Sequence, residues 1–122
     1  MRTHEVLIVV RRAEEFLAVH RSPENGAYWH QIAGGVEDGE SAAAAAVREL
    51  REETGLAADP EPTGRAFDYD GIHVDCFVAD APAGWEPRLD WEHDDYRWLS
   101  AAAAADLMYW PEPSEILRGF AS

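Results

Sequence analysis

The chain has 122 residues and contains no lysine, so all ten of its basic residues are arginine. We attribute this absence to compositional bias of the genome rather than to one dedicated phosphate site. Against 24 aspartate and glutamate residues, the arginines leave a net charge of −14. This charge argues against a bulk electrostatic grip on a nucleic-acid polymer or an anionic membrane. A small polyanionic substrate stays compatible with it, provided that metal ions bridge the two negative partners.

Cysteine and long apolar runs are also scarce. Cys76 is the only cysteine, which excludes a disulfide within the chain. It lies in an alternating strand pattern, and we expect it to behave as a small buried hydrophobe. The apolar stretch 6–10 is too short for the core of a signal peptide or for a membrane span. These observations predict a cytoplasmic protein with no membrane contact.

The length and the 47% of hydrophobic residues predict one folded domain over residues 1–122. The patterns predict strands at 5–12, 16–20, 28–32, 64–70, 72–79 and 96–99, and a loop at 22–26. Asp70-Gly71 predicts the turn of a hairpin. Helices are expected at 41–54, at 100–108, and near the end of the chain from Pro113 or Ser114. This order favours an α/β fold in which helices pack on a mixed sheet.

The helix expected at 41–54 carries acids where helix physics disfavours them. Ser41 is a good N-cap and Gly55 a good residue to end the helix. Glu49, Glu52 and Glu53 have i, i+3, i+4 spacing, so their carboxylates should share a face and repel one another. They also lie near the negative end of the helix dipole. Because hard cations such as Mg2+ prefer carboxylate oxygens, the three acids form a candidate metal site.

Residues 34–56 resemble the Nudix box, a motif of fixed spacing. Its defined positions are filled by Gly34, Glu40, Arg48, Glu49, Leu50, Glu52, Glu53, Gly55 and Leu56. The resemblance continues outside the box, with Tyr28-Trp29 before it and Glu92-His93 and Trp98-Leu99 after it. Membership of the Nudix family implies an α/β/α sandwich with a mixed central sheet. It also implies hydrolysis of a phosphoanhydride bond in a compound containing a nucleoside diphosphate, assisted by Mg2+, with Mn2+ as a substitute.

The resemblance also implies roles for individual residues. Glu49, Glu52 and Glu53 would be metal ligands, and the backbone carbonyl of Ala33 would add another. For the general base we prefer Glu53, and Glu92 in a later loop is the alternative; Glu92 could equally be a surface carboxylate.

Two further residues of the box have supporting roles in this interpretation. Arg48 would hold the catalytic glutamates in position, although a simple surface pair with Glu52 would also explain it. Glu40 would assist the metal and substrate through water.

Candidate substrate contacts come from several segments. Arg11 and Arg21 could contact phosphate or base, although surface charges are the ordinary alternative. Trp29 and Tyr96 could stack a purine or pterin ring, with core packing as the alternative. Gly34 and Gly35 could permit close backbone approach to metal or phosphate, or simply end a strand.

Among family members, the chain most resembles the bacterial dihydroneopterin triphosphate or dATP pyrophosphohydrolases. Diadenosine tetraphosphate hydrolysis and removal of 8-oxo-dGTP are alternative activities. A non-catalytic nucleotide-binding module of the same fold is the alternative of another class, although its usual sign is a degenerate box and this box is intact. The expected partner is therefore a small nucleotide or pterin polyphosphate, and a homodimer is compatible with the family.

Overall fold

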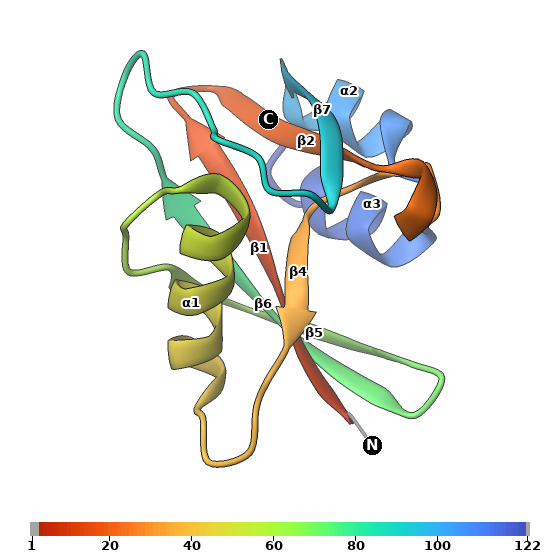
Figure 1. Ribbon diagram of the computed structural model, residues 1–122. Helices are drawn as coiled ribbons and strands as arrows, with labels where there is room; N and C mark the ends of the chain where they lie inside the picture. The colour runs from red at the N-terminus through yellow and green to blue at the C-terminus, as the bar shows by residue number, and fades with distance from the viewer. Residues whose placement is uncertain (1–2, 122) are drawn as a thin grey trace.

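The computed structural model describes residues 3–121, and it shows one mixed sheet with helices on both faces (Figure 1). The strands are β1 His4–Arg12, β2 Glu15–Arg21, β3 Trp29–His30, β4 Ile32–Gly35, β5 Glu61–Tyr69, β6 Ile72–Asp80 and β7 His93–Leu99. The helices are α1 Ala42–Thr54, α2 Ala101–Leu107 and α3 Pro111–Arg118, with a short 3-10 turn at Pro23–Asn25. The predicted α/β/α sandwich with a mixed sheet is confirmed.

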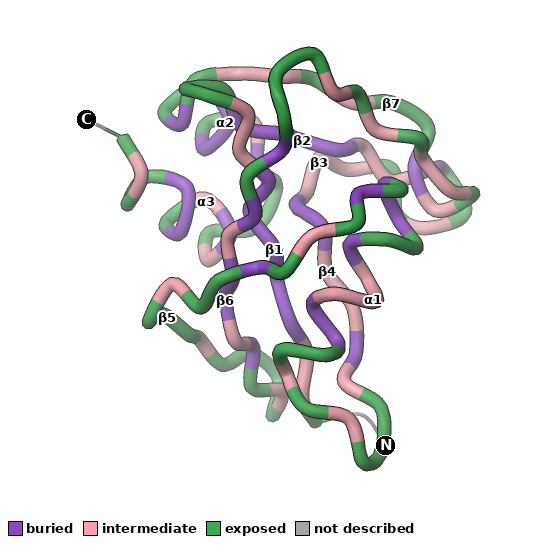
Figure 2. The backbone as a smooth tube through the Cα atoms, turned by 90° about the vertical axis from the view of Figure 1, so that its left-hand side faces the viewer, coloured by how far each residue is buried: buried purple, intermediate pink, exposed green. Residues whose placement is uncertain are grey.

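Strand β1 is the centre of the sheet. It pairs in parallel with β6 and antiparallel with β2 and β4, while β3 and β7 pair with β2, and β5 with β6. Its alternate side chains enter two separate hydrophobic clusters. Val6 and Ile8 pack with Leu50 of α1, whereas Leu7 packs with Leu117 of α3. Figure 2 shows β1 as a buried ribbon between the helical layers.

Local sequence signals set several element ends as expected. The Ser41 hydroxyl accepts a hydrogen bond of 3.1 Å from the Ala44 N–H, and Gly55 ends α1 with a φ of 82°. Asp70 and Gly71 both have positive φ, 47° and 78°, as a tight hairpin turn requires. These three predictions are confirmed.

Other boundaries differ from the prediction. The strand expected at 28–32 is two strands, since β3 pairs with β2 and β4 pairs with β1. The change of partner occurs at Gln31, and no periodic pattern along one strand reveals such a change. Helix α3 begins at Pro111 rather than at Pro113 or Ser114, because proline in a first helical turn gives up no intrahelical hydrogen bond.

The remaining expectations about the chain as a whole concern cysteine and membranes. Cys76 is buried and unpaired, and burial raises the pKa of its thiol to about 11, which confirms a small hydrophobe in the core. No helix within residues 3–121 combines the length and apolarity needed to cross a bilayer.

Substituting Leu50 by alanine should destabilise the fold strongly. Leu50 is fully buried between α1 and β1, so truncation leaves a cavity. We expect the free energy of unfolding to fall by about 2–5 kcal/mol, measured by urea denaturation. Arg51→Ala on the exposed face of the same helix is the matched control and should change it by less than about 0.5 kcal/mol. Equal effects of the two substitutions would contradict the packing described here.

Candidate functional site

Arg48 links α1 to β4 through a single guanidinium group. It donates from Nε and Nη2 to the two carboxylate oxygens of Glu40, both at 2.9 Å, and from Nη2 to the Gly35 carbonyl at 2.9 Å. Its Nη1 donates to Glu49 at 2.8 Å and to Glu52 at 3.3 Å. The paired guanidinium lowers the pKa of Glu40 to about 2. Arg48 therefore makes the surface pair with Glu52 and also fixes the orientation of Glu49.

The carboxylate of Glu49 lies directly against the backbone of β4. A Cβ atom built on Gly34 would overlap the Glu49 carboxyl group. Residue 34 must therefore be glycine for Glu49 to keep this position, which gives the first glycine of the box a steric reason.

Glu53 is the least compensated acid in the site. Its side chain is only 1% exposed, and neither carboxylate oxygen has a hydrogen-bond partner within residues 3–121. The nearest cationic candidate is His93, whose equally unpartnered Nε2 lies 3.8 Å from Glu53 Oε1. Burial, reinforced by Glu49 and then Glu92, raises the pKa of Glu53 far above its ordinary value. A buried carboxylate without a partner is costly, so the position favours an external positive group.

Glu52 occupies a different environment from the other two acids. Its side chain is 57% exposed and accepts a hydrogen bond of 3.3 Å from the Arg48 guanidinium. Among residues 3–121, no three His, Cys, Asp or Glu side chains form a ready-made metal cluster. The donor set nevertheless fits a hard cation, because Glu53, which lacks a hydrogen-bond partner within residues 3–121, and the half-buried Glu49 supply carboxylate oxygens. Glu52 would have to turn inward to join them.

A cavity of about 300 Å³ opens beside these acids. Glu49, Gly34, Ala33, Arg21 and Glu92 are among the residues that line it. Of the two candidate bases, Glu92 lines this cavity, whereas Glu53 is buried behind its wall and does not line it. The charge of Glu92 nevertheless contributes to the raised pKa of Glu53.

The loop that carries Glu92 is attached to the end of β2. The Ser22 N–H donates to the Glu92 carbonyl at 2.9 Å, and the Ser22 hydroxyl donates to it at 3.1 Å. Burial raises the pKa of Glu92, with Asp90 as the next cause. Arg21 is the last residue of β2, and its Nε donates a hydrogen bond of 2.8 Å to the Asn25 carbonyl.

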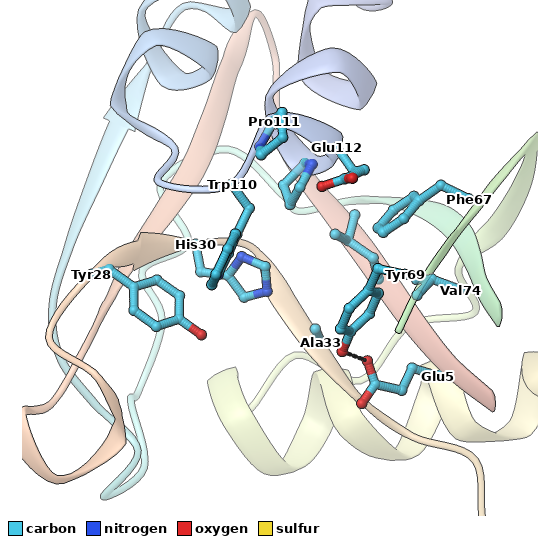
Figure 3. A pocket seen from close by; sticks show the side chains of 12 residues that line it. Glu5, Tyr28, His30, Ala33, Phe67, Tyr69, Val74, Trp110, Pro111 and Glu112 are labelled. Atoms are coloured by element: carbon cyan, nitrogen blue, oxygen red, sulfur yellow. Dashed lines mark hydrogen bonds between the residues drawn. The ribbon is translucent and has the colours of Figure 1, made fainter. Parts of the chain in front are cut away.

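A second cavity of about 290 Å³ adjoins the first and shares Glu5, Tyr28, His30, Ala33 and Tyr69 with it. Its other lining residues include Phe67, Trp110 and Glu112. Figure 3 shows the aromatic rings around this space, with the Tyr69 hydroxyl donating to Glu5 at 2.7 Å. We call the two cavities together the cleft, with an acidic end at Glu49 and an aromatic end at Trp110.

His30 lies at the junction of the two ends. Its Nδ1 is buried and has no hydrogen-bond partner in the described part of the chain. Burial, followed by the positive charge of Arg21 and by His93, lowers the pKa of His30 to about 4. The imidazole is therefore neutral at pH 7.

Three predicted substrate contacts are not brought to the cleft. Arg11 pairs with Asp80 at 2.7 Å at the far end of β1. Trp29 packs under the Arg97 guanidinium, 4.7 Å from its carbon to the ring centre. The Tyr96 hydroxyl donates to Glu86 at 3.2 Å on the outer strand β7. Neither cavity is lined by any of these three residues.

Four residues that line the cleft were not predicted from the sequence: Tyr28, Tyr69, Trp110 and Glu112. His30, expected near the cleft entrance with a structural role as the alternative, does line it. Tyr28 and His30 flank Trp29, and side chains alternate along an extended segment. Because of this alternation, the cleft could be lined either by Trp29 or by its two neighbours. No comparable local signal distinguishes Tyr69 or Trp110 from ordinary surface aromatics.

Comparison with known proteins gives the family from sequence and the fold from structure. The NUDIX domain model matches residues 1–120. The chain is 34% identical over 116 residues to an octanoyltransferase of Myxococcus xanthus, and the match covers 87% of this chain and 32% of that protein. It is 43% identical over 56 residues to the phosphatase NudJ of Escherichia coli K12, covering 46% of this chain and 37% of NudJ. The matched segments thus span about a third of the length of these relatives.

Solved structures share the whole fold. The E. coli dihydroneopterin triphosphate pyrophosphohydrolase superposes with a TM-score of 0.86 at 23% identity, covering 98% of this chain and 94% of that one. An Ap4A hydrolase of C. elegans superposes with a TM-score of 0.81 at 24% identity, covering 95% and 94%. With the intact box, the sandwich fold and the family match over nearly its full length, the chain belongs to the Nudix family.

Proposed function

We propose that this chain is a metal-dependent pyrophosphohydrolase. It cleaves a phosphoanhydride bond in a (deoxy)nucleoside or pterin triphosphate and releases the monophosphate and pyrophosphate. The observation that carries the proposal is the cleft, in which a cavity lined by the half-buried carboxylates of Glu49 and Glu92 adjoins an aromatic-lined cavity. Because solved structures of such low identity share only the fold, the substrate class is argued from the cleft itself.

The acidic end would hold the cation and the phosphates. Glu49, Glu53 and the Ala33 carbonyl would bind Mg2+ or Mn2+, and Glu52 would complete the set by turning inward. When bound, the cation would supply positive charge to the phosphate oxygens and to these carboxylates. Arg21 at the same cavity can add a guanidinium contact to a phosphate.

The carboxylates would also move the proton. Hydrolysis needs a base within hydrogen-bond reach of the attacking water, and Glu53 is our first assignment. Its burial keeps bulk water away, and its raised pKa makes it a good proton acceptor once positive charge favours its ionised form. Glu92 across the cavity is the second assignment.

The aromatic end would hold the heterocycle. Tyr28, Phe67, Tyr69 and Trp110 present flat rings around a cavity of about 290 Å³. Stacking on such rings is tolerant of ring type, so it supports both purine and pterin compounds. The diadenosine and 8-oxo-dGTP activities, the homodimer and the cytoplasmic location stay predictions from sequence.

A turnover screen is the direct test. The panel is dihydroneopterin triphosphate, the dNTPs, 8-oxo-dGTP, diadenosine tetraphosphate, ADP-ribose and nucleotide sugars, with Mg2+ at mildly alkaline pH. We expect one triphosphate to be preferred and to release pyrophosphate, and we expect EDTA to abolish the activity. Tight binding of a nucleotide without metal and without turnover would instead indicate the non-catalytic module.

Removing the charge of Glu53 should lower turnover without unfolding the protein. Glu53→Gln matches the shape of the protonated acid, so the buried position should accept it. We expect kcat to fall about a hundredfold or more, with thermal unfolding nearly unchanged. Glu61→Gln, an exposed glutamate at the start of β5, is the matched control. Near-normal turnover would remove Glu53 from both the base and ligand roles, and a loss seen only in Glu92→Gln would move the base there.

Gly34→Ala should impair activity through the position of Glu49. The new methyl group would displace the Glu49 carboxylate, which is the end of a flexible side chain, so stability should change little. We expect turnover to fall about a hundredfold, as displacements of about 1 Å in active sites do. Gly119→Ala is the matched control, because its methyl group would meet the Arg65 side chain away from the cleft. Full activity of Gly34→Ala would show that the close contact with Glu49 is not required.

A further inference from the structure

Two carboxylates line the aromatic end of the cleft, and they have different environments. Glu5 accepts a hydrogen bond of 2.7 Å from the Tyr69 hydroxyl and so belongs to the wall. Glu112 is half-buried, and its side chain makes no hydrogen bond or ion pair with any residue in the range 3–121. The proposed hydrolysis gives Glu112 no task. A half-buried acceptor group without a partner, facing a cavity, is a candidate for ligand recognition.

Glu112 lies in the first turn of α3, directly after Pro111. An ionised carboxylate offers acceptors only, so its complement is a group that presents hydrogen-bond donors.

The rings on either side set the plane of a ligand. In Figure 3 the Glu112 carboxylate lies between the ring of Trp110 and the ring of Phe67, at the edge of the cavity opposite Ala33. A flat heterocycle lying among these rings would direct one edge towards Glu112. The opposite side of the heterocycle would then face the acidic end, where a triphosphate could reach Arg21 and the metal ligands.

Charge in the cleft supports this orientation. Among residues 3–121, no lysine or arginine lines the aromatic end, and His30 is neutral at pH 7 because burial lowers its pKa to about 4. A phosphate group would therefore meet only negative charge, from Glu5 and Glu112, at the aromatic end. The phosphates must point away from Glu112, and the ring must point towards it.

We infer that Glu112 selects rings that carry two adjacent N–H donors, namely the ring N–H and the exocyclic amino group found side by side in guanine and in pterins. The inference rests on the proposed function, because it names which triphosphates that same cleft accepts. Guanine presents a ring N–H beside an exocyclic amino group, and pterin presents the same pair. Both can donate in parallel to the two oxygens of one carboxylate. The matching edge of adenine presents one donor and one acceptor, so a lone pair would face a carboxylate oxygen.

The experiment compares kcat/KM for dGTP, dihydroneopterin triphosphate, dATP and dTTP on the wild type, Glu112→Gln and Glu115→Gln. In the wild type we expect dGTP or dihydroneopterin triphosphate to exceed dATP by at least about tenfold. Glu112→Gln should lower the value for both about 10- to 100-fold and raise it for dATP, since glutamine offers one donor and one acceptor. Glu115→Gln, exposed and one turn further along α3, is the matched control and should leave all values unchanged.

A binding measurement separates this inference from the proposed hydrolysis. Guanosine, dihydroneopterin and adenosine carry no phosphate, so calorimetric titration of each tests the aromatic end alone. Preference for guanosine or dihydroneopterin, lost in Glu112→Gln, supports the role of Glu112 even if no triphosphate is hydrolysed; that combination would overturn only the proposed function. The tighter of the two identifies the ring system. Equal binding of adenosine and guanosine, unchanged by Glu112→Gln, would overturn the inference even in an active enzyme.

Discussion

The guanidinium group of Arg48 is the interaction on which the arrangement of the site depends. A chain with a net charge of −14 places three glutamates at the end of α1, where both mutual repulsion and the helix dipole oppose them. Arg48 offsets this repulsion at Glu49 and Glu52 while also binding Glu40 and the Gly35 carbonyl. One cation therefore joins helix, loop and strand, and it can do so because a planar guanidinium has five donors in fixed directions.

Arg48 makes no hydrogen bond to Glu53 among those that it donates in the site, and the buried position of Glu53 lowers the stability of the fold. Its folded-state pKa is raised, so the folded protein retains a proton that the unfolded chain releases once the pH rises above about 4.5. The contribution of this group therefore lowers stability as pH increases through that range. The packing of Leu50 and the β1 side chains must offset this loss. Stability given up at a reactive position is a common property of functional sites.

The parts of the structure that follow from neighbouring residues were predictable. Ser41 and Gly55 bound the helix, and Asp70-Gly71 forms the turn, because capping and positive φ act within a few residues. The aromatic end was not predictable, since its rings come from separate parts of the sequence. They meet only because the chain changes its pairing partner at Gln31, from β2 for strand β3 to β1 for strand β4. Trp29 illustrates the difference: its residue type suited a ligand contact, but its orientation depends on which strand it pairs with. The catalytic and ligand roles themselves stay predictions.

The two ends of the cleft differ in charge, and this difference determines where an acidic protein can bind a triphosphate. An acidic protein repels a triphosphate except where a bound cation or an arginine reverses the local charge. Of the two ends of the cleft, as lined by residues 3–121, only the acidic end has such groups. The aromatic end does not need charge, because stacking on neutral rings is insensitive to the net charge of the protein. His30 lies at the junction of the two ends, where its Nδ1 has no hydrogen-bond partner among residues 3–121. Because its imidazole is neutral, it adds no positive charge that would attract phosphate to the aromatic end, so one ligand can occupy both ends. The direction in which a substrate enters is therefore fixed by the distribution of charge in the cleft before any specific base contact forms.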